Sequence, residues 1–273
     1  MELRQITAVY YSATGVTDRV VHTLGEALAE ALSLPLEFRS FTKPAERDMT
    51  LAFDEKDLVL VGSPTYAGKL PNKLLPDFQA RFQGSGALAI PVVTFGGRAY
   101  DNSLAELCAL LEANGFHTIA AGAFPGRHAF TDVLGEGRPD WDDKRTIQGF
   151  AGQIGEKLRE MREIPPPVKV PGDPEAPYYI PKGLDGEPVK FLKAKPRTDL
   201  GKCSRCGVCI RTCPMGAIHP ENPADVPGTC IKCHSCVRKC TRRAKYFDDP
   251  AFLSHVAMLE RDFQEPKEIE IFY

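Results

Sequence analysis

Eight of the nine cysteines of this chain lie in two copies of one spacing. The first copy is Cys203, Cys206, Cys209 and Cys213, with Pro214 after it, and the second is Cys230, Cys233, Cys236 and Cys240, so that every cysteine recurs 27 positions later. Three thiols separated by two residues each can wrap one compact loop around a small inorganic group, but a fourth thiol, one residue farther on, points out of that loop. The two runs are therefore predicted to exchange their fourth ligands and to fold as one unit.

The spacing C-x2-C-x2-C-x3-C is the ligand run of two-cluster iron-sulfur proteins. We expect two [4Fe-4S] clusters, because each set offers four cysteines and no histidine at a ligand position. Cluster one would be held by Cys203, Cys206, Cys209 and Cys240, and cluster two by Cys230, Cys233, Cys236 and Cys213. The pattern indicates a protein that handles single electrons.

Structural zinc and disulfide bonds are the two alternative uses of these cysteines. Structural zinc draws two cysteines from each of two separated knuckles, which four cysteines in eleven residues match poorly. A disulfide framework needs an oxidising compartment, whereas residues 1–12 carry no signal-peptide pattern. We expect a cytoplasmic location, because thiolate-bound cubane clusters favour reducing, oxygen-poor conditions.

Composition divides the chain into four parts. Nine prolines fall between Met161 and Leu200, too many for a helix or a central strand. We predict a first domain over residues 1–163, a proline-rich linker over 164–194, the cysteine-rich module over 195–249, and a C-terminal extension over 250–273 that packs back on the body. No apolar stretch has the length of a membrane span.

Charge is also segregated. Residues 195–249 hold eleven Lys or Arg against five Asp or Glu, although the whole chain has a net charge of -2. These cations can neutralise thiolate-bound clusters and can dock the module to an acidic redox partner. Nucleic acid is not expected as a partner, since no nucleic-acid motif accompanies the basic residues. The sequence is also compatible with a homodimer.

In residues 1–163, apolar strands alternate with amphipathic helices. Strands are predicted at 6–11, 36–40, 58–62, 87–95 and 116–123, and helices follow Thr17 and cover 72–82, 102–114 and 141–162. Strands that are apolar on both faces indicate a parallel sheet covered on both sides, which binds ligands beyond the carboxyl ends of its strands.

Three loops at that end of the sheet have the composition of a ligand site. Ser12 to Thr17 offers three hydroxyls, a glycine and a helix start, which suit a phosphate monoester, although such residues also serve simply as N-caps. The loops at 63–71 and 95–102 each place one tyrosine among small residues, as backbone approach to a flat ring and stacking on it require.

On these motifs, residues 1–163 resemble flavodoxin, and residues 199–247 resemble bacterial two-cluster ferredoxins. The resemblance implies an α/β fold with a flavodoxin-like, doubly wound, five-stranded parallel sheet of order 2-1-3-4-5, plus a small α+β ferredoxin-like domain. It implies FMN as a cofactor. The cofactor-binding residues carried over to the three loops are Ser12, Ala13, Thr14, Gly15, Val16 and Thr17; Pro64, Thr65, Tyr66, Ala67 and Gly68; and Thr94, Phe95, Gly96, Gly97, Arg98, Tyr100 and Asn102.

Some residues depart from the family pattern or receive no role. Thr241 stands where the family has a proline, and Arg98 stands where flavodoxins often have acidic residues near the ring, so it either stabilises a reduced flavin or faces solvent. Cys108 is expected to be a buried small residue, and His234 a solvated or hydrogen-bonded loop residue. His128 either reaches the rim of the flavin or is structural.

We therefore expect electron transfer between FMN and the two clusters, coupling one-electron and two-electron carriers, with redox proteins as partners and no catalytic acid, base or nucleophile. Two alternatives remain at this stage. One is a flavin-dependent reductase of a small acceptor fed by the clusters, and the other is a redox or iron sensor without FMN.

Overall fold

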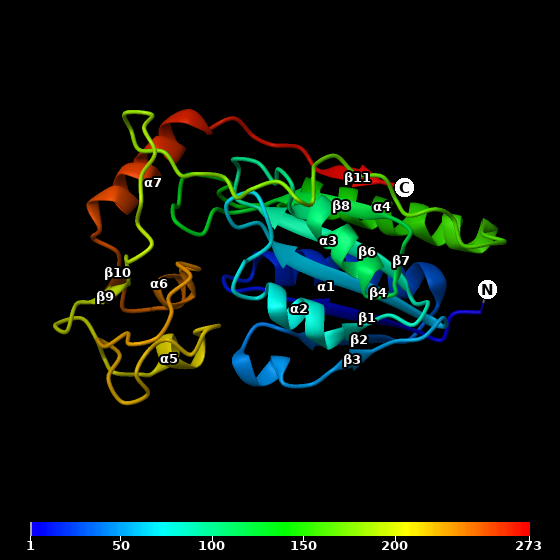
Figure 1. Cartoon of the computed structure of the whole chain (residues 1–273), viewed down its shortest axis with the longest axis horizontal. Helices are drawn as coiled ribbons and strands as arrows, with labels where there is room; N and C mark the ends of the chain where they lie inside the picture. The colour runs from blue at the N-terminus through cyan, green and yellow to red at the C-terminus, as the bar shows by residue number, and fades with distance from the viewer. Residues whose placement is uncertain (1) are drawn as a thin grey trace.

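The computed structural model describes residues 2–273 as a layered α/β domain with the cysteine-rich module beyond one end of its sheet (Figure 1). The central strands are β1 (Gln5–Tyr10), β2 (Leu36–Ser40), β4 (Asp57–Pro64), β6 (Leu88–Phe95) and β8 (Ala121–Pro125). All pair in parallel, in the order β2-β1-β4-β6-β8. Numbered among these five, the order is 2-1-3-4-5, as the resemblance implied.

Helices cover both faces of the sheet. The face with α1 (Val16–Leu32) and α4 (Trp141–Glu160) buries Ile6, Leu24, Leu58 and Phe150. The opposite face, with α2 (Leu75–Arg81) and α3 (Ser103–Ala113), buries a second set of apolar side chains, including Phe41, Phe78, Phe82 and Leu107. Because both faces are covered, β4 and β6 are continuous apolar runs, and full burial of each large apolar side chain contributes about 1.5–3 kcal/mol.

The sheet is larger than the expected five strands. The strand predicted at 116–123 is two segments, since β7 (His117–Thr118) pairs with the start of β6 and β8 pairs with its end. The chain's last strand, β11 (Glu270–Phe272), pairs antiparallel with β8. The tail therefore covers a sheet edge that would otherwise present unpaired main-chain groups.

Short elements complete the first domain. The 3-10 helix η1 (Pro44–Arg47) follows β2, and β3 (Leu51–Ala52) pairs with β5 (Phe82–Gln83) in a separate small sheet. None of the helices in residues 2–273 has the length and apolar composition needed to span a membrane.

The cysteine-rich module has little regular structure. It contains β9 (Arg197–Thr198) paired antiparallel with β10 (Lys245–Tyr246), and the short helices α5 (Val208–Arg211) and α6 (Ser235–Arg238). The strands of the first domain point their carboxyl ends toward this module (Figure 1). Helix α7 (Pro250–Asp262) follows the module and buries Phe252, Met258 and Leu259, so the tail packs against the rest of the chain through α7 and through β11.

Candidate flavin and iron-sulfur sites

The loop between β1 and α1 is built to receive an anion. Gly15 precedes α1 with φ 93° and ψ -1°, and no side chain caps this helix. In residues 2–273, the main-chain N–H groups of residues 13–17 donate to no protein acceptor, whereas the N–H of Asp18 is held by the Ser12 hydroxyl at 3.0 Å. Five free donors beside the positive end of a 17-residue helix fit a phosphate group.

Hydrogen bonds hold this loop against its neighbours. The Ser12 N–H donates to the Thr42 hydroxyl at 3.0 Å, and the hydroxyls of Thr17 and Thr94 are 2.7 Å apart. Thr94 lies at the end of β6, so the first and third predicted loops are tied together across the sheet end. These contacts within the protein fix the shape of the cradle.

A cavity of about 240 Å³ opens beside this loop. Most of the residues expected to bind cofactor line it, namely Ser12, Ala13, Thr14, Val16, Thr17, Pro64, Thr65, Tyr66, Ala67, Gly68, Thr94, Phe95, Gly96 and Arg98. A side chain at Gly96 would stand 2.4 Å from the His128 ring, so only glycine fits there. An anion cradle at one end and aromatic or small residues along the wall match the two parts of FMN, its phosphate and its flat ring.

Four expected residues do not line the cavity. Gly15 and Gly97 lie at positive φ, 93° and 88°, and shape the loops rather than the wall. Tyr100 is buried in the core, and its hydroxyl donates to Glu270 of β11 at 2.8 Å. Asn102 accepts from the N–H of Asp173 at 2.9 Å, and so holds the linker. Tyr100 and Asn102 are thus held by the tail and the linker rather than at the cavity wall, and cofactor binding by these two residues stays a prediction.

Tyr66 reaches the cavity from the first domain. Its hydroxyl lies 3.3 Å from that of Tyr11, and the two rings meet edge to face. Burial raises the pKa of both phenols well above the ordinary value, and the nearby Cys233 thiol raises it further. Both tyrosines thus stay neutral and stand close to the cysteine-rich module.

The opposite wall comes from four segments, and sequence reasoning connected only His128 of the first with the site. The loop after β8 contributes Arg127, His128, Ala129 and Phe130; the linker and α7 contribute Tyr179, Pro181, Phe191, His255 and Leu259; and the module contributes Ile231, Lys232 and Cys233. Only His128 carried a sequence signal, through its place after the last parallel strand. The residues of the other segments could not be predicted, because the sequence of a linker or a tail contains no periodic pattern that shows where it packs.

Two histidines in this wall have fixed tautomers. Nδ1 of His128 accepts from the N–H of Phe130 at 3.0 Å, so a neutral ring carries its proton on Nε2. Nδ1 of His255 lies 2.8 Å from the Lys182 carbonyl oxygen and must donate to it, which leaves Nε2 as an acceptor. Burial lowers the pKa of His128 to about 3 and also lowers that of His255, so both rings are neutral.

Arg98 does not face open solvent. Its guanidinium stacks on the Tyr179 ring, 4.0 Å from the ring centroid, and pairs with Asp101. The cation is therefore anchored at the cavity wall by the linker.

The cysteines surround two further cavities in the interlocked arrangement. One is lined by Cys203, Cys206, Cys209 and Cys240, hereafter cage one, and the other by Cys213, Cys230, Cys233 and Cys236, hereafter cage two. All eight are free thiols. Within residues 2–273, no three His, Cys, Asp or Glu side chains form a group suited to a single metal ion. The eight cysteines as cluster ligands remain a prediction.

The backbone repeats with the same 27-residue offset as the cysteines. Arg205 and Lys232 both have positive φ, as do Gly207 and His234, and Gly216 and Arg243. The N–H of Ala217 donates to Cys213 Sγ at 3.3 Å, and that of Ala244 donates to Cys240 Sγ at 3.2 Å. Loops that turn sharply and point N–H groups at sulfur suit thiolate-bound clusters.

His234 is not the solvated loop residue that the sequence suggested. It is 5% exposed, stacks on Phe247 with 4.6 Å between ring centroids, and also contacts Phe130 and Phe252. Its Nε2 has no hydrogen-bond partner in the described chain. Burial lowers its pKa to about 3. Cys108, by contrast, is buried in α3 as expected.

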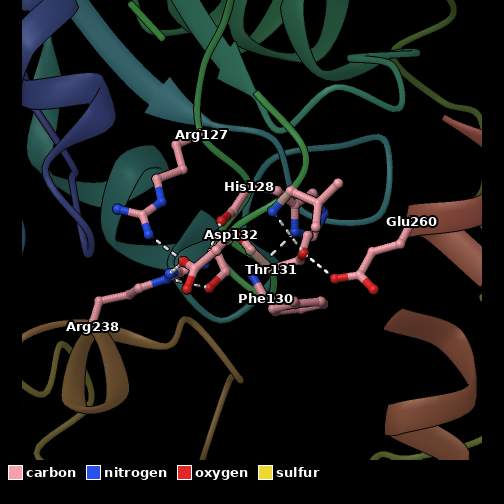
Figure 2. Close-up of polar contacts among 9 residues, drawn as sticks. Arg127, His128, Phe130, Thr131, Asp132, Arg238 and Glu260 are labelled. Atoms are coloured by element: carbon pink, nitrogen blue, oxygen red, sulfur yellow. Dashed lines mark hydrogen bonds and ion pairs between the residues drawn. The ribbon is translucent and has the colours of Figure 1, made fainter. Parts of the chain in front are cut away.

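Two arginines fasten the module to the first domain. Arg238 of α6 donates to the main-chain oxygens of His128 and Ala129, each at 2.9 Å, and to Thr131 and Asp132 (Figure 2). From the other side, the buried Arg47 donates to the Pro214 oxygen at 2.9 Å. Figure 2 also shows Thr131 joined to Glu260 of α7, so the loop after β8 is held by module and tail together.

Comparison with known proteins gives one family match, which lies in the cysteine-rich module. Residues 195–248 match the model of the 4Fe-4S dicluster domain. No curated protein matches the chain.

Three solved structures give similarities to the first part of the chain. A flavodoxin from the domain Archaea has a TM-score of 0.41 and 15% identity, with 57% of this chain and 99% of that chain covered. A short-chain flavodoxin associated with a non-canonical PDU bacterial microcompartment has a TM-score of 0.40 and 13% identity, with 58% of this chain and 100% of that chain covered. The two-electron reduced flavodoxin of Megasphaera elsdenii has a TM-score of 0.34 and 13% identity, with 56% of this chain and 99% of that chain covered.

The assignment of the first domain depends on its own strand order and on the anion cradle at the end of β1, and that of the module on its cysteines and the domain match. Together they describe a redox protein with an electron-transfer role. The chain therefore joins a first domain with the strand order of a flavodoxin-like fold to a C-terminal module that matches the 4Fe-4S dicluster domain over residues 195–248.

Proposed function

We propose that this chain transfers electrons between FMN in the cavity of the first domain and two [4Fe-4S] clusters in cages one and two. FMN exchanges one or two electrons and each cluster exchanges one, so the fusion would couple the two kinds of redox chemistry. The chain's own residues would hold the three groups in adjoining sites, with Cys233 in the wall that the flavin cavity and cage two share.

One observation carries the proposal. Cys233 lines cage two and also lines the flavin cavity, together with its neighbours Ile231 and Lys232. Cage one, in contrast, shares no lining residue with the flavin cavity. Cage two is therefore the inner site and cage one the outer site of a linear route.

Specific side chains support each part of this role. The free N–H groups of residues 13–17 would bind the phosphate, and Tyr66 would contact the ring. Lys232 lines the flavin cavity and donates to the Leu192 oxygen at 2.5 Å and to the Cys230 oxygen at 3.3 Å, which places a cation at the cavity beside a cysteine of cage two. A cation at that point favours added negative charge on both neighbours.

The test is anaerobic purification followed by flavin and iron analysis and a stepwise reductive titration. We expect one FMN and about eight irons per chain. Electron paramagnetic resonance should show two cubane signals, and the flavin absorbance should bleach in the same titration. Bound zinc in place of iron, or a preparation with iron but no flavin site, would refute the proposal.

A further inference from the structure

The outer cage is surrounded by arginines that the protein itself leaves unused. Arg205 and Arg242 line cage one, Arg211 follows Cys209 in α5, and Arg243 follows the last cysteine run. All four side chains are exposed. Within residues 2–273 they form no ion pair and donate no side-chain hydrogen bond, although Arg197, Lys202 and Arg238 of the same module are each paired with an aspartate.

Of these arginines, hereafter the arginine collar, Arg205 and Arg242 line the same cage as the most accessible cysteine of the module. Cys206 is the one exposed thiol among the eight. The guanidinium of Arg211 lies over the same loop, because its Nη1 stands 2.7 Å from the position that a Cβ on Gly207 would occupy. An electron that enters or leaves through cage one would therefore cross a surface rich in unpaired positive charge.

Neutralisation of the cluster charge does not account for the collar. A cation placed for that purpose is already buried beside the cages: Lys245 is 3% exposed and lies near Cys209 and Cys236. Buried charges act on a cluster with little screening, whereas exposed guanidinium groups act mainly on molecules that approach from solvent.

The charge of the rest of the chain would orient an acidic partner toward the arginine collar. The whole chain has a net charge of -2, although the module carries an excess of six positive charges. An acidic protein would be repelled by the first domain and attracted to the module, so the charge distribution would orient it as it approaches. Guanidinium forks also match carboxylates in geometry, and arginine is enriched at protein interfaces.

We propose that the arginine collar is the docking surface for a small acidic one-electron carrier protein, which exchanges electrons with cage one at Cys206. The inference depends on the proposed function, since it requires a cluster in cage one. It adds the partner's chemical class and the face that it uses.

The test uses anaerobic holoprotein and a reduced, acidic plant-type ferredoxin as the probe, with cluster bleaching followed by stopped-flow absorbance. The rate constant should fall about tenfold or more between low and high salt, as electrostatic steering requires. The triple variant Arg205→Gln, Arg242→Gln, Arg243→Gln should lower the low-salt rate about tenfold and remove most of the salt dependence. A control variant, Lys73→Gln, Arg162→Gln, Lys169→Gln, removes the same charge from exposed sites outside the module and should keep the rate.

Three results would overturn the docking proposal. They are an unchanged rate in the collar variant, an equal loss in the control, or collar-dependent binding of a single-stranded oligonucleotide at physiological salt without any effect on the ferredoxin rate. If the triple variant loses iron, Arg211→Gln and Arg243→Gln singly give the same test. Reduction by dithionite separates the docking proposal from the proposed function. A collar variant should still accept electrons from dithionite in its clusters and its flavin. If the proposed function is wrong, the wild-type protein itself will fail to do so.

Discussion

The guanidinium of Arg238 donates a hydrogen bond of 2.9 Å to the main-chain oxygen of His128, and so joins the cysteine-rich module to the loop that walls the flavin cavity. The same side chain also binds the oxygens of Ala129 and Thr131. Together with the bond from Arg47 to the Pro214 oxygen, this residue holds the module against the first domain.

Replacement of this arginine should loosen the junction. Arg238→Gln leaves several main-chain oxygens without their donor, and we expect a loss of about 2–3 kcal/mol in the free energy of unfolding. Flavin bleaching after cluster reduction should also slow, since the module is no longer held against the loop. Anaerobic denaturation and stopped-flow absorbance measure the two effects. Arg242→Gln, on an exposed side chain of the same module, is the matched control and should keep stability within about 0.5 kcal/mol.

The interlocked ligand sets can be separated by single substitutions. Cys213 belongs to the first sequence run but lines cage two, and Cys240 belongs to the second run but lines cage one. Cys213→Ser should therefore remove the signal of the inner cluster, and Cys240→Ser that of the outer cluster, as read by electron paramagnetic resonance and iron content. Cys108→Ala, in α3, should keep all the iron. Loss of the opposite cluster in each variant would disprove the exchange of ligands.

The phosphate cradle depends on the backbone at Gly15. Its φ of 93° strains any residue with a side chain, although a Cβ there would meet no atom within 4 Å. Gly15→Ala should therefore distort the free N–H groups and weaken FMN binding about tenfold, for a backbone cost of about 1–2 kcal/mol. Gly152→Ala in α4 also adds a methyl group in open space, but in regular helix, and should leave FMN affinity unchanged. Fluorescence titration with FMN compares the two, and equal affinities would exclude a role for this turn.

Acid should destabilise the wall of the cavity through His128. Its pKa is about 3 in the folded protein, lowered first by burial and then by His255, Arg238 and Arg98, against about 6.5 in the unfolded chain. The unfolded state thus binds the proton more tightly, so this contribution to stability is complete above pH 6.5 and is lost as the pH falls toward 3. Between pH 7 and pH 5 the loss should be about 2 kcal/mol. His128→Gln should show a smaller decrease over that range in anaerobic denaturation, and an unchanged decrease would assign the acid sensitivity elsewhere.

The sequence predicted the features that short-range patterns encode. Strand order followed from the flavodoxin resemblance, and the loop of residues 12–17 could be recognised because it lies between an apolar strand and a periodic helix. The cage sets could be written down because cysteine spacing limits which thiols share a loop.

What could not be predicted depends on long-range packing. Tyr100 looked like a ring-stacking residue, but Glu270, 170 positions away, holds its hydroxyl in the core. Tyr179 and Phe191 reach the flavin cavity from a segment whose only sequence signal is proline. His234 lies in an aromatic cluster formed by residues from three separate segments of the chain, which no local pattern announces.

The central claim is that electrons pass between the clusters and the flavin through the wall that contains Cys233. The most direct measurement mixes anaerobic holoprotein with less than one equivalent of a one-electron donor of lower potential than either cofactor, and follows clusters and flavin together by rapid-freeze electron paramagnetic resonance and absorbance. The account predicts that cluster signals rise first and then decline as the flavin takes up the electrons, and that Cys213→Ser abolishes this transfer. A flavin that stays oxidised while the clusters remain reduced would contradict it.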